Sequence, residues 1–154
     1  MKNLILIFFI TLGLCSCNSD EIKTQDNLDV KLDMKVTNSK GEDLLNPKNT
    51  FAYDQSKIKL FYLVGDDLKE VYDSTKDSPR NFFIFERDGH FIIRVFLNSS
   101  TKDQYSTTLI QWNEKDTDTI KSEFTIVGGS VSKKNIWFNE GLILNYEPYF
   151  DVSK

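Results

Sequence analysis

The sequence predicts an all-β domain, most specifically an immunoglobulin-like β-sandwich of about seven to nine antiparallel strands. Three observations support this prediction. Apolar and polar residues alternate with a period of two in several segments, and turn dipeptides rich in glycine separate these segments at short intervals. No stretch combines a helical period with capping residues. The alternative is an up-and-down β-barrel of about eight strands, whose interior could hold a ligand.

The first predicted strand spans residues 28–37, where apolar side chains alternate with Asp, Lys and Thr. One of its faces should therefore lie against a core and the other in solvent. The turn at 38–41 ends this strand. Residues 44–47 are expected to form a loop that crosses the end of the core, since Pro47 cannot donate to a strand ladder. Residues 58–64 are apolar on both faces, which predicts a central strand.

The strongest local signal is Asp88-Gly89, which stands between the apolar segments 82–87 and 90–97. This dipeptide accepts the positive φ angles of a type I′ hairpin turn. Gly128-Gly129 joins two further predicted strands, at 118–127 and 131–138, in the same way. Weaker signals predict strands at 68–72, at 107–112 and, after a turn at 139–141, at 142–144.

The first 16 residues have the form of an export signal, with the positive start Met1-Lys2-Asn3 followed by an apolar run. That run is shorter than the ~20 apolar residues that a membrane-spanning helix needs. Residues 18–28 are mostly polar and are predicted to be a flexible tether, because such a segment buries too little surface to offset its ordering entropy. Residues 29–154 are predicted to form a single β domain.

Two cysteines lie at the end of the signal, in Leu14-Cys15-Ser16-Cys17. The small Ser16 fits the narrow pocket of a signal peptidase, so Cys17 is the predicted site of lipidation, whereas Leu14 makes Cys15 a poorer acceptor. The alternative is an ordinary secretory signal with incidental cysteines. If Cys17 carries a lipid, the mature chain has no free thiol for disulfides, thiol catalysis or metal binding.

Charge and composition argue against several classes of function. Removal of residues 1–16 takes away Lys2 and leaves 18 basic against 23 acidic residues, a net charge of about −5. No block of basic residues exists, so a nucleic-acid partner is not expected. The only histidine, His90, follows a predicted turn and is expected to be exposed. It has no Gly-x-Ser-x-Gly motif beside it, so we predict neither an enzyme nor a metal or cofactor site.

Carboxylates offer the one remaining catalytic hypothesis, since a glycoside hydrolase needs only two acids about 5–9 Å apart. These acids all lie in or beside turn-like segments, where they are expected for solubility alone. Residues 116–118 resemble the start of a calcium loop, but Ile120 replaces an oxygen ligand, so that pattern fails. The candidate acids are Asp66, Asp67, Glu70, Asp116, Asp118 and Glu123.

Aromatic residues make up 13% of the chain and are the feature that points to binding. Exposed rings can stack on sugars or form a protein-binding patch. The candidate binding aromatics are Trp112, Tyr146 and Tyr149, of which the two tyrosines should be either exposed or packed on a sheet edge. Trp137 alternates with asparagines in a predicted strand and is expected to fill the core.

Leu14-Cys15-Ser16-Cys17 resembles the lipobox of bacterial lipoproteins, and residues 18–21 resemble the surface-export signal of Bacteroidota lipoproteins. Segments 41–47, 118–121 and 136–141 look like elements of small uncharacterised surface lipoproteins of Bacteroidota. The resemblance implies a lipid anchor at Cys17 in the outer membrane, with the domain on the cell surface or, alternatively, on the periplasmic face. It implies no biochemical activity.

Two function hypotheses follow. The first is a membrane-anchored, non-catalytic β-sandwich that binds an extracellular protein or glycan. The second is a lipoprotein that carries a ligand or binds a glycan, through a barrel cavity or an aromatic surface, with a carboxylate-dependent hydrolase as a weaker variant. Neither hypothesis requires a cofactor.

Overall fold

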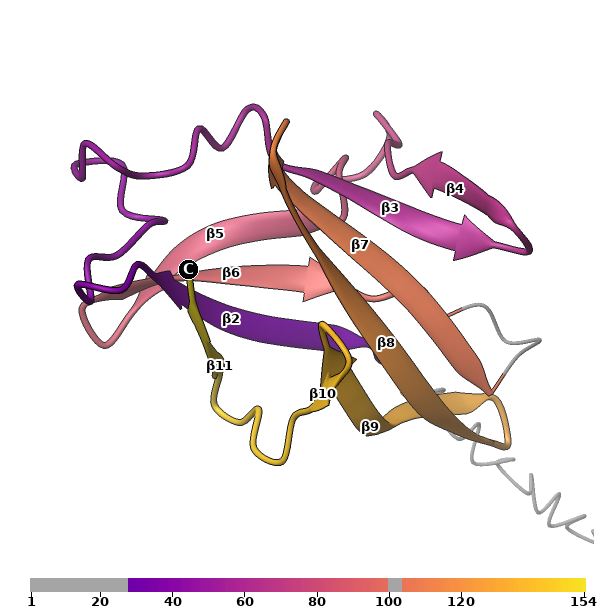
Figure 1. Cartoon of the computed structure of the whole chain (residues 1–154). Helices are drawn as coiled ribbons and strands as arrows, with labels where there is room; N and C mark the ends of the chain where they lie inside the picture. Colours follow the sequence, from indigo (N-terminus) through magenta and orange to yellow (C-terminus); the bar gives the residue numbers. More distant parts are fainter. Residues whose placement is uncertain (1–27, 100–103) are drawn as a thin grey trace, which may run out of the picture.

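The computed structural model describes residues 28–99 and 104–154, and this part of the chain contains strands and no α-helix (Figure 1). The strands form two β-sheets that share one hydrophobic core, which confirms the predicted all-β fold. Neither sheet closes on itself, so the barrel alternative is wrong. None of the described residues forms a helix long and apolar enough to cross a membrane. The predicted signal peptide, Cys17 and tether residues 18–27 lie outside the described residues.

The larger sheet has seven strands, in the order β1-β9-β8-β7-β3-β4, with β10 paired to β9. Their bounds are β1 (Leu28–Asp29), β3 (Lys59–Val64), β4 (Asp67–Glu70), β7 (Tyr105–Asn113), β8 (Asp116–Val127), β9 (Ser130–Phe138) and β10 (Gly141–Leu142). The smaller sheet has four strands, in the order β11-β2-β6-β5. Their bounds are β2 (Lys31–Thr37), β5 (Phe82–Arg87), β6 (His90–Phe96) and β11 (Phe150–Ser153).

Seven consecutive strands follow the immunoglobulin-like arrangement. β2, β6 and β5 lie side by side in the smaller sheet, as strands B, E and D do in that fold. β4, β3, β7 and β8 lie side by side in the larger sheet, as strands C′, C, F and G do. β11 occupies the edge position beside β2 that strand A takes in that fold. The sheet topology therefore confirms the predicted β-sandwich, and its strand order is like that of the immunoglobulin fold.

The strand directions correct one part of the prediction. β1 pairs with β9 in parallel, and β11 pairs with β2 in parallel, so both sheets are mixed rather than antiparallel. The predicted first strand is divided at Val30, because the chain crosses there from one sheet to the other, and the Val30 carbonyl accepts a hydrogen bond from the Leu97 amide. β1 starts at Leu28, the first described residue.

The two predicted hairpin turns are confirmed. Asp88 and Gly89 have φ angles of 52° and 76°, and Gly128 and Gly129 have φ angles of 57° and 88°. Positive φ at both central residues is the signature of the type I′ turn, whose twist matches that of the flanking strands.

The core lies between the two sheets. It includes alternate side chains of β2, namely Leu32, Met34 and Val36. The loop after β2 crosses the end of this core as predicted, with Leu45 only 1% exposed. Each such side chain contributes roughly 1.5–3 kcal/mol when fully buried. β3 lies between β7 and β4, which confirms the predicted central strand, although Leu63 and Val64 at its end are exposed beside the short edge strand β4.

Candidate functional site

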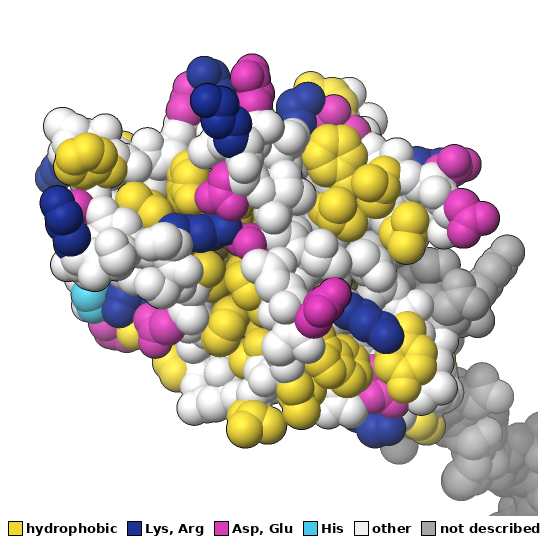
Figure 2. All heavy atoms as spheres, viewed as in Figure 1, with side chains coloured by type: hydrophobic (Ala, Val, Ile, Leu, Met, Phe, Trp, Pro, Cys, Tyr) yellow, Lys and Arg dark blue, Asp and Glu magenta, His cyan; other side chains and the backbone are white. Residues whose placement is uncertain are grey.

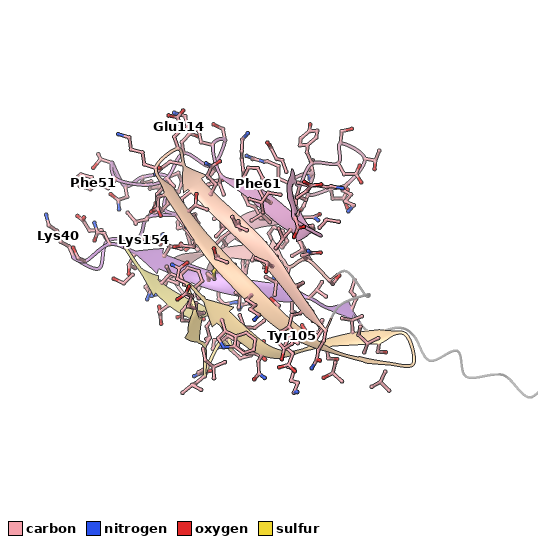
Figure 3. All side chains as sticks on the ribbon, turned by 45° about the vertical axis from the view of Figure 1, so that its right-hand side comes forward. Lys40, Phe51, Phe61, Tyr105, Glu114 and Lys154 are labelled. Atoms are coloured by element: carbon pink, nitrogen blue, oxygen red, sulfur yellow. The ribbon has the colours of Figure 1, made fainter. Side chains whose placement is uncertain are left out.

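The outer face of the larger sheet presents a polar and aromatic surface on β7, β8 and β9. Thr107 pairs with Lys121, which in turn pairs with Trp137. Residues in direct register project from the same face of a sheet, so this row crosses three strands. A neighbouring row begins at Tyr105, which Figure 3 labels at the start of β7, and continues to Glu123.

A pocket of about 330 Å³, open to solvent, lies on this face. Figure 2 shows hydrophobic, cationic and acidic side chains next to one another over β8 and β9. The lining residues combine an indole ring, an ammonium, a carboxylate and two hydroxyls, which is a mixture suited to an amphipathic ligand. They are Thr107, Thr119, Lys121, Trp137 and Glu140.

Two aromatic rings flank the ammonium of Lys121. The ring centroids of Tyr105 and Trp137 are 6.2 Å apart, and the planes are inclined by 52°. The Lys121 Nζ lies 4.8 Å from the Tyr105 centroid and 5.6 Å from the Trp137 centroid, within the range of cation–π attraction. Within residues 28–99 and 104–154, Lys121 has no carboxylate within ion-pair distance. Its three N–H donors therefore remain available to a ligand.

A tight turn between β9 and β10 holds Glu140 at the pocket. Asn139 and Glu140 have φ angles of 46° and 71°, in the left-handed region that favours glycine. The Asn139 side chain fixes the turn to β8, since its Oδ1 accepts from the Thr119 amide at 2.9 Å and its Nδ2 donates to Asp118 at 2.7 Å. The predicted turn at 139–141 is thus present, but Gly141 is not its positive-φ residue. Glutamate carries a backbone cost in this conformation that glycine would not.

Glu123 lies in the same outer face and is fully occupied by protein donors. It accepts hydrogen bonds from Gln104 at 2.8 Å, from the Lys134 Nζ at 2.8 Å and from the Asn135 amide at 2.6 Å. The hydrogen bond from Lys134, with that from Asn135, holds the pKa of the Glu123 carboxyl below its ordinary value. Glu123 is therefore a fixed anion that braces the sheet beside Tyr105.

Trp112 was predicted as a binding aromatic, and this prediction is wrong, because its side chain is 0% exposed. β7 carries Trp112 into the core, where its Nε1 donates to Asp118 at 2.6 Å. Tyr53 stacks on the indole with ring centroids 5.3 Å apart. Trp112 thus supports the fold from inside the sandwich.

Lys154 closes this buried group. Its Nζ lies 2.7 Å from Asp116 and 2.5 Å from Asp118. The Tyr53 hydroxyl donates to Asp116 at 2.5 Å, and burial together with this bond raises the pKa of Tyr53 well above its usual range. We call Tyr53, Trp112, Asp116, Asp118 and Lys154 the inner cluster, and Tyr105, Lys121, Trp137 and Glu140 the outer cluster.

The expectation that Trp137 fills the core is also wrong. Trp137 is half-buried on the outer face, whereas its neighbour Ile136 is 0% exposed in the core. Of the two candidate tyrosines, Tyr146 is half-buried against the core, and the Lys133 Nζ lies 5.1 Å from its ring centroid. Burial raises the pKa of Tyr146. Tyr149 is also half-buried, and neither tyrosine lines the pocket of the outer cluster.

The remaining candidate residues lie away from this pocket. His90 is half-buried on β6 of the smaller sheet, opposite Arg87. Asp66, Asp67 and Glu70 are exposed around the hairpin of β3 and β4, where Glu70 forms an ion pair with Lys59. In the described part of the chain, no three His, Cys, Asp or Glu side chains are grouped so that they could hold a metal ion.

The chain matches no protein-family model, no curated protein and no solved structure. The resemblance to Bacteroidota lipoproteins therefore remains a prediction from the sequence.

Proposed function

We propose that this protein is a lipid-anchored surface protein whose immunoglobulin-like domain binds a glycan without chemically changing it. The observation that carries the proposal is the outer cluster, where an indole ring and an ammonium with no acidic partner among the described residues line one open pocket. The pocket favours a glycan over a protein partner, because it is small and rich in groups that bind hydroxyls.

The chemistry of the pocket suits a pyranose ring. The apolar face of a sugar stacks on an aromatic ring, which Trp137 supplies and Tyr105 extends. Sugar hydroxyls need both donors and acceptors around the ring edge. Lys121 donates, Glu140 accepts, and the hydroxyls of Thr107 and Thr119 do either. A pocket of about 330 Å³ has room for one or two sugar rings. Because it is open to solvent, it would not enclose its ligand.

The carboxylates of the domain support a binding role rather than hydrolysis. Glu123 is committed to three protein donors, and Asp116 and Asp118 share one ammonium inside the inner cluster. Among the described residues, Glu140 is the one acid that lines the pocket. A glycosidase needs a second carboxylate across the bound sugar.

The lipid anchor at Cys17 is part of the proposal. A single acyl chain holds a protein to a membrane only marginally, while two or more chains hold it firmly. Cys17→Ala should therefore abolish labelling by a fatty-acid analogue and release the protein from membranes, whereas Cys15→Ala should leave both unchanged. Labelling that persists in Cys17→Ala would contradict the anchor.

Calorimetric titration of the protein with a panel of neutral and acidic oligosaccharides tests the site, with tryptophan fluorescence as a second readout for the unchanged protein. Trp137 should report binding, and Trp137→Ala should weaken it by about tenfold or more, which corresponds to ~1.4 kcal/mol. Tyr72→Ala is the matched control, because Tyr72 is an aromatic residue that is 68% exposed and does not line the pocket. Equal affinity in the two variants would refute the site.

A further inference from the structure

One end of the larger sheet carries three exposed aliphatic side chains. Leu28 is 62% exposed, Ile126 is 43% exposed and Val127 is 70% exposed. They belong together in space, because Leu28 pairs with Val131, and Val131 pairs in turn with Ile126. Figure 1 shows the hairpin of β8 and β9 at the far end of the molecule from the C-terminal residue. This end, which we call the apolar tip, consists of Leu28, Ile126, Val127, Gly128 and Gly129.

The apolar tip lies in a stretch without charge. Residues 124–132 contain no Asp, Glu, Lys or Arg, although 27% of the whole chain is charged. A cost of desolvating charged groups would oppose the entry of a loop into an apolar phase. That cost is absent from the hairpin turn. A Cβ added at Gly128 would meet no atom within 4 Å, so the space beside this residue is open.

The chain outside the described residues points to what covers the tip. Ten residues, 18–27, separate Cys17 from Leu28, the first described residue and a member of the tip. Even fully extended, they reach at most about 40 Å. The chain from an anchor at Cys17 therefore enters the domain at the tip itself and not at the opposite end.

We propose that the apolar tip enters the interfacial region of the bilayer to which Cys17 is anchored, and that it is a second point of attachment. The inference rests on the lipid anchor of the proposed function. Aliphatic side chains on a neutral turn match the boundary between headgroups and acyl chains. Two points of attachment fix the orientation of the domain, which one tether alone leaves free.

The orientation has a consequence for the pocket. Lys121 and Ile126 are five residues apart on β8, which corresponds to about 17 Å along an extended strand. The outer cluster would then lie close to the membrane surface. Its ligand would be a glycan that is itself attached to the membrane, rather than one that is free in solution.

The test uses the lipidated protein in vesicles of phosphatidylethanolamine and phosphatidylglycerol with a nitroxide on the acyl chains. An environment-sensitive dye is attached to Val127→Cys or, as a matched control, to Phe51→Cys. Phe51 is 63% exposed and lies at the other end of the domain from Tyr105 (Figure 3). The introduced cysteine is the only free thiol of the mature lipoprotein, because Cys15 leaves with the signal and Cys17 is acylated.

The dye at residue 127 should shift to the blue and be quenched by the nitroxide at least severalfold more than the dye at residue 51. If the protein floats with the vesicles but both dyes give equal, water-like signals, insertion of the apolar tip is refuted and the anchor at Cys17 is not. Protein that does not float would overturn the anchor itself. A blue shift that grows with protein concentration in the absence of lipid would show that a second copy covers the tip, and it too would overturn the proposal. Leu28→Ser with Ile126→Ser, introduced together with Val127→Cys, should abolish the difference between the two dye positions on vesicles.

Discussion

The inner cluster and the outer cluster are built from the same kinds of side chain and have opposite characters. Each holds a tryptophan, a tyrosine and a lysine, with one or two carboxylates beside them. In the inner cluster the lysine is shared by two carboxylates, the tyrosine hydroxyl has an acceptor, and Trp112 is 0% exposed. In the outer cluster, within the described residues, Lys121 has no acidic partner, and Tyr105 is 46% exposed.

The difference shows that residue type alone does not separate a structural group from a binding group. What separates them is whether the protein satisfies its own polar atoms. Buried donors and acceptors that bond to one another stabilise the fold. Donors and rings left open on a rigid surface can be used by a ligand. Substitutions within each cluster test this contrast, and substitutions outside both clusters test how far it extends.

Replacing each tryptophan by alanine should give the largest difference between the two clusters in the free energy of unfolding. Trp112→Ala should lower the free energy of unfolding by about 3–5 kcal/mol, because it leaves a cavity under Tyr53 and removes a donor to Asp118. Trp137→Ala should lower it by about 1 kcal/mol or less, as is usual for surface substitutions. Chemical denaturation measures both values. Similar losses would mean that the outer cluster is structural too.

Removal of one carboxylate from each cluster should give a smaller difference in the free energy of unfolding. Asp118→Ala leaves the Trp112 Nε1, the Asn139 amide and Lys154 without a shared acceptor, and it should cost about 2–3 kcal/mol. Glu140→Ala should change the free energy of unfolding by no more than about 0.5 kcal/mol. A large loss in Glu140→Ala would place that residue among the structural groups.

Glu140→Gly should stabilise the domain and weaken glycan binding. Glycine relieves the cost of a left-handed backbone at φ 71°, so the domain should gain about 0.5–1 kcal/mol. The same change removes the acceptor at the pocket and should weaken glycan binding. A variant that loses stability would show that the conformation at residue 140 carries no strain.

The pH dependence tests the brace at Glu123. Its pKa is lower in the folded protein than its ordinary value of 4.5, so its contribution to stability is complete above that value. The contribution is lost as the pH falls through the lower, folded-state pKa. Glu123→Gln should therefore flatten the loss of stability between neutral and acidic pH, measured by thermal melts. Parallel curves for the two proteins would contradict the brace.

The smallest effect is expected at His90, which touches neither cluster. His90→Ala should change the free energy of unfolding by less than about 0.5 kcal/mol and leave glycan affinity unchanged. Loss of binding in a folded His90→Ala protein would show that the functional surface extends to the smaller sheet. It would also reopen the possibility of catalysis.

The sequence predicted the fold better than the site, for physical reasons that are visible in particular residues. The turns at Asp88-Gly89 and Gly128-Gly129 are local, since positive φ angles select glycine and its neighbours without help from the rest of the chain. The alternation in β2 is local as well. In contrast, β11 was not predicted, because only its partner β2, far away in the chain, makes residues 150–153 a strand.

The roles of the two tryptophans were exchanged for a similar reason. Trp137 shares its strand face with Asn135 and Asn139, so the period of two places it on the polar side, and hydrophobicity alone suggested the core. Trp112 alternates with Ile110 and Thr108, which are both 0% exposed. The neighbours at i ± 2 therefore carried the correct signal. The meeting of Tyr105, Lys121 and Glu140 depends on strand register and could not be predicted without the structure.

The parallel pairing of β11 with β2 also determines how the protein acquires its structure. Phe150 lies opposite Met34, so this contact joins residues more than one hundred positions apart. Closing so long a loop costs entropy before any contact repays it, and sandwiches rich in such contacts fold in milliseconds to seconds rather than microseconds. Until β11 arrives, one edge of β2 has no strand beside it, and an unpaired edge is open to proteases and to other unfolded chains. Folding speed, as much as final stability, therefore limits how much intact protein accumulates.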